Sequence, residues 1–103
     1  MPLNRLKAKT TTECLWLYLL SLMKDEPIYA YEIRDKIKEK FDFTIGNVTA
    51  YMVLYKLERD GYVKTEWLMK ENRQRKYYRI TPKGKELLKE GRGYLKDLGE
   101  NLG

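Results

Sequence analysis

The sequence contains no histidine and a single cysteine, Cys14, among its 103 residues. Histidine is the side chain that most often moves protons at neutral pH and a very common metal ligand, so its absence argues against acid–base catalysis and most metal sites. The lone cysteine forms no intrachain disulfide and has no neighbouring base to activate it as a nucleophile. We therefore expect a cytoplasmic protein that is not an enzyme and that holds no metal or other cofactor.

Long apolar runs and glycine-rich phosphate loops are also missing. The apolar stretch at residues 14–23 is about half of the roughly 20 residues that span a bilayer. The residues after it, Lys24 to Pro27, do not resemble a signal-peptide cleavage site, so we expect no export. The glycines lack the spacing of nucleotide-binding loops. With 43% hydrophobic residues, the chain is predicted to form one domain, residues 1–103, around a modest core.

Positive charge is in excess, and one segment holds the whole surplus. Residues 62–85 contain eight Lys and Arg but two Glu, which equals the formal net charge of +6 for the chain. Such clustering is typical of proteins that bind an anionic partner such as nucleic acid. The alternative is a solvated basic loop in a lysine-rich, heat-stable protein, and charge alone does not separate the two.

The first half of the chain reads as helical. Residues 1–10 form either a mobile basic arm or a short helix. A first helix is expected from a cap at Thr11 or Thr12 to Met23. Because this helix is apolar on nearly every side, we expect it to lie between its own core and a second copy of the chain.

Two further helices follow. The helix expected over residues 29–41 has one apolar and one charged face. Gly46 and Asn47 are turn and cap residues before a third helix, which Gly61 ends. The third helix is expected to bury Ala50, Val53, Leu54 and Leu57 and to expose Val48, Met52, Tyr55 and Arg59, flanked by Thr49, Tyr51 and Lys56.

After Gly61 the pattern changes to that of β-strands. Residues 62–69 and 75–80 are rich in β-branched and aromatic side chains, and the polar residues 70–74 are predicted to be a hairpin tip. Thr81 and Pro82 suit the N-cap and first position of a last helix. This order predicts a mainly α fold with a small β-hairpin: a winged helix-turn-helix with a core at 11–80 and a C-terminal dimerisation helix at 81–103.

A DNA-binding winged helix inserts its third helix into the major groove and rests its hairpin on the adjacent minor groove or backbone. Here the helix and the hairpin are expected to present their cations and tyrosines as one surface. The predicted DNA-binding residues are Asn47, Thr49, Tyr51, Met52, Tyr55, Lys56, Lys70, Arg73, Arg75 and Lys76. Asn47 is equally well explained as a helix cap.

Other aromatic residues near this surface are expected to pack. Tyr77 and Tyr78 alternate across a strand, so one lies in the core and the other partly covers it. Tyr29 and Tyr31 are assigned to packing, although the exposed one of the two could touch phosphate. Cys14 is expected to be a small buried hydrophobic residue.

The sequence resembles the PadR-like transcriptional regulators over residues 27–88. The matching motifs are IYAYEI, VTAYMVLYKLERDGYV and RKYYRITPKGKELL, in this order. The resemblance implies a homodimeric DNA-binding repressor, with the dimer interface on the first and last helices, in a family whose members often respond to small aromatic or drug-like molecules. Thr49 and Tyr51 match the family's DNA-facing Thr and Tyr. Met52 stands where a basic residue is common, and Ala30 where glycine is usual.

Two questions remain open from the sequence. The predicted dimer interface is Leu15, Trp16, Leu19, Leu87, Leu88, Leu95 and Leu98, and Trp16 could instead stack on an aromatic effector. A second functional hypothesis is a winged-helix module that docks on a protein through Tyr51, Met52 and Tyr55, with the hairpin binding an acidic partner. The charge surplus favours DNA, whereas the apolar face of the third helix favours a protein.

Overall fold

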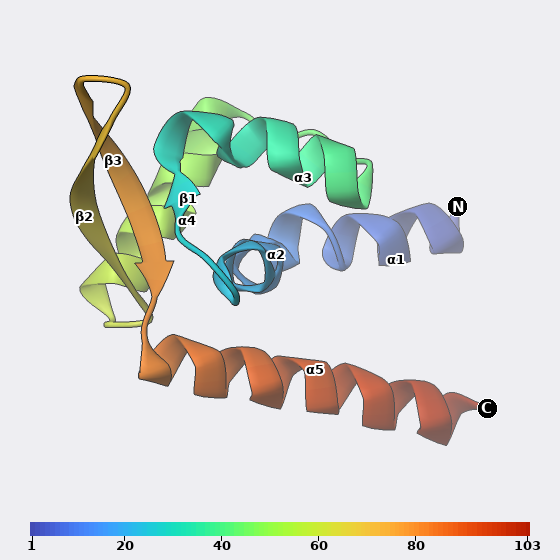
Figure 1. Cartoon of the computed structure of the whole chain (residues 1–103). Helices are drawn as coiled ribbons and strands as arrows, with labels where there is room; N and C mark the ends of the chain where they lie inside the picture. Colours follow the sequence, from blue (N-terminus) through green and yellow to red (C-terminus); the bar gives the residue numbers. More distant parts are fainter.

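The computed structural model describes residues 1–103 and combines five α-helices with a three-stranded antiparallel sheet (Figure 1). The helices are α1 (Pro2–Lys9), α2 (Leu15–Met23), α3 (Ile33–Phe41), α4 (Asn47–Arg59) and α5 (Pro82–Leu102). The strands are β1 (Ile28–Tyr29), β2 (Val63–Lys70) and β3 (Arg73–Ile80), and 3₁₀ turns at Thr12–Cys14 and Ala30–Glu32 precede α2 and α3. This order confirms the predicted winged helix-turn-helix. None of the helices has both the length and the apolar composition needed to cross a bilayer.

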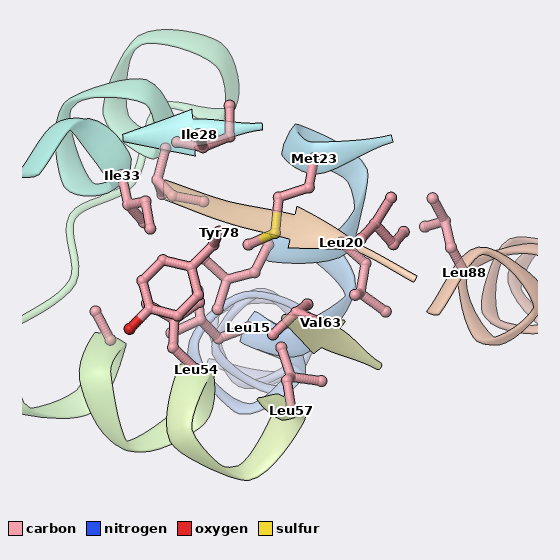
Figure 2. Close-up of a cluster of buried hydrophobic side chains, with 14 of the residues drawn as sticks. Leu15, Leu20, Met23, Ile28, Ile33, Leu54, Leu57, Val63, Tyr78 and Leu88 are labelled. Carbon is pink, nitrogen blue, oxygen red and sulfur yellow. The ribbon is translucent and has the colours of Figure 1, made fainter. Parts of the chain in front are cut away.

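Helix α2 lies at the centre of the core. Its buried residues are Leu15, Leu19, Leu20 and Met23, and α3, α4, α5 and β3 all pack against it. Figure 2 shows side chains of α2 meeting those of α4, of the two long strands and of Leu88 on α5. Burial of each Leu or Met side chain contributes about 1.5–3 kcal/mol to folding. The apolar residues on this side of α2 therefore belong to the core of its own chain, whereas Trp16, Leu17 and Leu22 are only half-buried.

This position corrects part of the predicted dimer interface. Leu15 and Leu19 are 1% and 0% exposed, and Leu88 is 5% exposed, in the isolated chain. Side chains that their own chain covers so completely have no surface to offer a second copy. Leu15, Leu19 and Leu88 are therefore core residues.

The sheet contains a strand that the sequence reasoning missed. β1 pairs with β3 through Ile28↔Tyr78 and Tyr29↔Tyr77, so that β3 is the central strand in the order β1-β3-β2. Because residues 28–32 form this strand and a 3₁₀ turn, α3 begins at Ile33, later than predicted. A strand of two residues is too short to show alternation, which is why the sequence gives no signal for it. β1 therefore connects the hairpin to the start of α3.

The hairpin between β2 and β3 ends in a tighter turn than predicted. Its two turn residues are Glu71 and Asn72, with φ values of 53° and 63°. Both angles lie in the left-handed region, as in the two-residue turns that match the twist of β-strands. The remaining residues of the predicted tip, 70 and 73–74, belong to the strands.

The helix boundaries on either side of the hairpin follow the predicted signals. Gly61 adopts φ +82° directly after α4, a conformation that glycine accepts without strain. The hydroxyl of Thr81 accepts a hydrogen bond of 3.1 Å from the amide of Gly84, and Pro82 is the first residue of α5. The N-cap at Thr81 is confirmed.

The N-terminal boundary differs from the prediction. Residues 2–9 are helical, so the short helix and not the mobile arm is found. Neither Thr11 nor Thr12 caps α2, because the Thr11 hydroxyl donates instead to a carbonyl of α1. The phenol of Tyr18 in α2 donates to the carbonyl of Thr10, which ties the end of α1 to the core. Burial raises the pKa of this phenol above its ordinary value.

Helix α5 begins where two backbone segments lie very close together. A Cβ atom on Gly84 would lie 2.1 Å from the carbonyl oxygen of Tyr62, far inside van der Waals contact. One on Gly93, also in α5, would meet nothing within 4 Å. Only the first of these glycines is required by packing, although both weaken the helix by about 1 kcal/mol relative to alanine.

Replacing Gly84 with alanine is expected to lower the free energy of unfolding by about 3 kcal/mol, because backbone must move to admit the methyl group. The matched change Gly93→Ala should raise it by about 1 kcal/mol through helix propensity alone. Urea denaturation followed by circular dichroism measures both. Effects of the same sign would contradict the close approach of α5 to Tyr62.

Candidate nucleic-acid interface

The outward face of α4 is exposed as predicted. Val48, Thr49, Tyr51, Met52, Tyr55 and Lys56 all lie on the surface, whereas Ala50, Leu54 and Leu57 are buried on the opposite face and Val53, also predicted to be buried, is half-buried. The helix therefore has an apolar inner side that fixes it in the core and an outer side with aromatic, hydroxyl and cationic groups. These outer groups can meet either the edges of bases or a protein surface.

Asn47, the first residue of α4, is held by a residue of α3. The guanidinium of Arg34 donates through Nη1 to Oδ1 of Asn47 at 3.1 Å and through Nε to the carbonyl of Ile45 at 2.8 Å. Because a guanidinium only donates, the amide oxygen of Asn47 faces Arg34 and its NH2 group stays free to donate elsewhere. Gly46 is the N-cap, and no side chain caps the helix, so the explanation of Asn47 as a cap is wrong.

The sequence reasoning missed Arg34 as a functional candidate. It lies on the charged face of α3, where it is one cation among several, and its partners are 11 and 13 residues away in the sequence. Nothing in the local pattern distinguishes it from a solvated arginine. Only the packing of α3 against the loop before α4 reveals its role.

The strand register divides the side chains of the hairpin, here called the wing (residues 63–80), between two faces. Val63 pairs with Ile80 and Trp67 with Lys76, and successive residues of a strand point to opposite faces. Trp67, Met69, Gln74 and Lys76 therefore lie on the side of the core and α4, whereas Lys70, Arg73 and Arg75 lie on the other side. The cations of the wing are thus divided between its two faces: Lys76 points to the α4 side, whereas Arg73 and Arg75 belong to the other face and also border the cleft between the wing and α4.

Arg75 is engaged within the chain. Its Nη2 atom lies 3.1 Å from a carboxylate oxygen of Glu71, its guanidinium lies 4.9 Å from the ring centroid of Tyr29, and its side chain is 21% exposed. Lys70, the last residue of β2, and Arg73, the first residue of β3, are exposed and take part in none of the ion pairs of the chain. Arg75 thus braces the wing against β1, and Lys70 and Arg73 are the free cations at its tip.

Two other surface arginines also form ion pairs within the chain. Arg59 donates to Asp60 at 3.1 Å, and this contact lowers the pKa of the Asp60 carboxyl. Arg79 pairs with Glu66 at 2.8 Å. These arginines lie at the end of α4 and at the base of the wing, away from the start of α4.

The remaining aromatic residues and the cysteine follow the predictions in part. Tyr78 is buried and Tyr77 is half-buried, as alternation predicts. Tyr29 packs between Tyr77 and Arg75, whereas Tyr31 is 77% exposed. Cys14 is half-buried rather than fully buried.

A cleft of about 360 Å³ lies between the wing and the start of α4. Its walls include the aromatic residues Tyr31, Tyr51 and Trp67 and the basic residues Arg73, Arg75 and Lys76, and no carboxylate lines it. A smaller groove of about 200 Å³ with Arg34, Asp35, Asn47 and Tyr51 in its walls lies between α3 and α4. Tyr31 and Tyr51 border both spaces, so together they form one hollowed surface over the start of α4.

A second exposed apolar surface lies on the last helix. Leu95, Leu98 and Leu102 of α5 are exposed, and Trp16 and Leu87 are half-buried where α5 passes α2. Figure 1 shows α5 leaving the base of the wing and running past the rest of the chain to the C-terminus. This stripe is therefore separate from the outer face of α4.

Known proteins share this arrangement. The model of the transcriptional regulator PadR-like family matches residues 19–90. Transcriptional regulator Rv3488 of Mycobacterium tuberculosis is 27% identical over 86 residues, which cover 84% of this chain and 79% of the relative. The X-ray structure of a PadR-like transcription factor from Bacteroides fragilis is 30% identical, with a TM-score of 0.77 over 95% of each chain. PadR of Bacillus subtilis, solved in complex with operator DNA, is 23% identical, with a TM-score of 0.65 over 74% of this chain and 45% of that one.

Replacing Arg34 with methionine is expected to lower the free energy of unfolding by about 1–3 kcal/mol, because the carbonyl of the buried Ile45 loses its charged donor. Lys38→Met on the same helix removes an exposed pair with Asp42, which solvent screens, and should cost much less. Urea denaturation compares the two variants. Equal losses would mean that Arg34 is an ordinary surface residue.

Proposed function

The chain belongs to the transcriptional regulator PadR-like family, a family of regulators rather than enzymes, and from this premise we propose that it is a sequence-specific DNA-binding protein that acts as a homodimeric repressor. The observation that carries the proposal is the hollowed, carboxylate-poor surface where the start of α4 meets the basic wing. A DNA-binding regulator works where the chromosome lies, so we also propose a cytoplasmic location.

In the proposed complex α4 enters the major groove with its first turns leading. Asn47, Thr49 and Tyr51 supply donors there, and the NH2 group of Asn47 is available because Arg34 engages its oxygen. Free backbone N–H groups at the start of the helix favour a phosphate at the same point. Met52 gives an apolar contact such as a thymine methyl group accepts. Tyr55 and Lys56 follow on the same face and reach the flanking backbone.

The wing enters the adjacent minor groove in this proposal. A two-stranded ribbon in a narrow groove turns one face to each wall, so cations on both of its faces meet phosphates. Lys70 and Arg73 at the tip contact phosphates on one wall of the groove, and Lys76 contacts phosphates on the other. Arg75, paired with Glu71 and stacked on Tyr29, contributes mainly by holding the wing in place.

The relative from Bacillus subtilis supports this proposal, because that protein was solved with operator DNA and has the same fold. At 23% identity the likeness concerns the fold. The residues proposed to contact DNA are therefore inferred from the exposed side chains of this chain, and no operator sequence is inferred from the relative.

We further propose that the exposed stripe on α5 forms the dimer interface. Leu95 and Leu98 present apolar surface to solvent, and Trp16 and Leu87 adjoin them. Apolar side chains in a row on a helix favour association with a second copy. Dimerisation would present two α4 helices to successive major grooves about 34 Å apart.

We propose repression and a response to small aromatic or drug-like molecules on the basis of the family alone, since the site itself does not bear on either. Trp16 is the residue on which an aromatic effector would stack, because its ring borders Gly91 of α5 and is half-buried. Interface burial explains the same position, so the effector role of Trp16 stays a prediction.

The alternative function is a module that docks on a protein. It is favoured by the exposed apolar side chains Met52 and Tyr55 on α4 and Trp67 and Met69 on the wing. Such a module would take up little random-sequence duplex at low salt, whereas a DNA-binding protein takes up much. The absence of carboxylates from the cleft favours DNA.

Replacing Arg73 with glutamine is expected to weaken binding to every duplex and to lower the slope of log affinity against log salt by about one, the loss of one phosphate contact. Lys89→Gln removes the same charge from the exposed surface of α5 and should change neither quantity. Fluorescence anisotropy of a labelled duplex, titrated at several salt concentrations, measures both. An unchanged slope for Arg73→Gln would contradict the role of the wing tip.

A further inference from the structure

The position of the cleft between α4 and the wing matters for the proposed function, because these two elements are assigned to different grooves of the DNA. Its walls come from the start of α4, from the turn after β1 and from the α4-facing side of the wing, through Tyr51, Tyr31 and Trp67 respectively. It is the space between the element proposed for the major groove and the element proposed for the minor groove.

In B-form DNA a single sugar–phosphate strand separates a major groove from the minor groove beside it. The major groove is about 12 Å wide and admits a helix, and the minor groove is about 6 Å wide. A protein with α4 in one and the wing in the other must straddle that strand. We propose that this cleft seats the strand, with Trp67 packed against its sugars and Lys76 on its phosphates. The inference rests on the proposed function.

The chemistry of the walls fits a sugar–phosphate strand. The cleft has three cationic residues and no carboxylate, which suits an anionic occupant. The phenols of Tyr31 and Tyr51 can donate to phosphate oxygens. A deoxyribose also presents C–H groups, and these pack against the flat face of an aromatic ring.

Trp67 does not take part in the hydrophobic core. It is 64% exposed, although on the same face of the wing Tyr78 is buried and Thr65 is half-buried. Met69, the next residue on that face, is equally exposed. Exposed apolar side chains that gather at a concave surface indicate a binding site. Because Trp67 lies within the cleft, its partner is the occupant of the cleft.

The two walls of the cleft are joined by contacts within the chain. Arg75 joins the wing to β1 through its contact with Tyr29, and β1 leads directly into the turn that carries Tyr31. The two walls are thus connected through the sheet rather than through a mobile loop. A site formed in advance loses less entropy on binding than one that must be ordered by its ligand.

Trp67 can report on its own surroundings, because Trp16 is the only other tryptophan. In a Trp16→Phe variant, acrylamide quenching of fluorescence measures the access of solvent to Trp67. The probe is a random-sequence duplex of about 30 base pairs at low salt, long enough for two half-sites one turn apart. We expect saturating duplex to lower the quenching constant by more than half. Trp16→Phe changes a half-buried residue, so a second comparison leaves Trp16 in place. The fluorescence of Trp67 is then obtained as the difference between the intact protein and a Trp67→Phe variant.

Affinity provides a second measurement. Trp67→Ala should weaken duplex binding about fivefold or more, in the range of aromatic contacts with nucleic acid. Tyr94→Ala removes an aromatic ring of similar exposure from α5 and should leave the affinity unchanged. Lys76→Gln should weaken binding more than Lys64→Gln, which removes the same charge from the opposite face of the wing.

Anisotropy of the labelled duplex separates the outcomes. Duplex binding that leaves Trp67 as accessible as in the free protein overturns this inference and leaves the proposed function standing. Equal affinities for Trp67→Ala and Tyr94→Ala also overturn it. If no duplex binds at low salt, the proposed function and this inference fail together.

Discussion

The surface of this protein depends on the burial of α2 against α4, α5 and β3. Leu19, Leu20 and Leu54 are completely buried where these elements meet, and the loss of one such side chain typically costs about 2–5 kcal/mol. Because the same core side chains contact the inner faces of α4 and of the wing (Figure 2), they fix the angle between the two elements. The width of the cleft, and hence any shared contact with DNA, follows from that angle.

The sequence predicts the elements whose signals lie within a few neighbouring residues. It does not predict features that depend on contacts between residues far apart in the chain. The apolar spacing of α4, the stop at Gly61 and the cap at Thr81 are each fixed within a few residues, and each is confirmed. β1 has only two residues and no period, so it was missed. The apolar composition of α2 predicts a helix between its own core and a second copy of the chain, but it does not tell which of its leucines face the core, because that depends on the tertiary packing.

The candidate site likewise combines local signals with contacts between distant residues. Charge counts located the wing cations, but their faces depend on a register set by the Glu71–Asn72 turn, and a shift of one residue would exchange the faces. The contact of Arg34 with Asn47 spans two helices and leaves no local signal. The resulting surface has few free cations. Lys70 and Arg73 at the tip and Lys76 beside α4 are therefore expected to carry most of the electrostatic attraction to DNA.

The most direct test of the account is chemical footprinting of the protein on a duplex selected from genomic fragments. Guanine N7 lies in the major groove and adenine N3 in the minor groove, so methylation protection distinguishes the grooves. The account predicts two patches of protected guanine N7 about one helical turn apart. It also predicts protected adenine N3 in the minor groove beside each patch. Protection confined to one groove would contradict the proposed placement of α4 and the wing, and a single patch would contradict the proposed dimer.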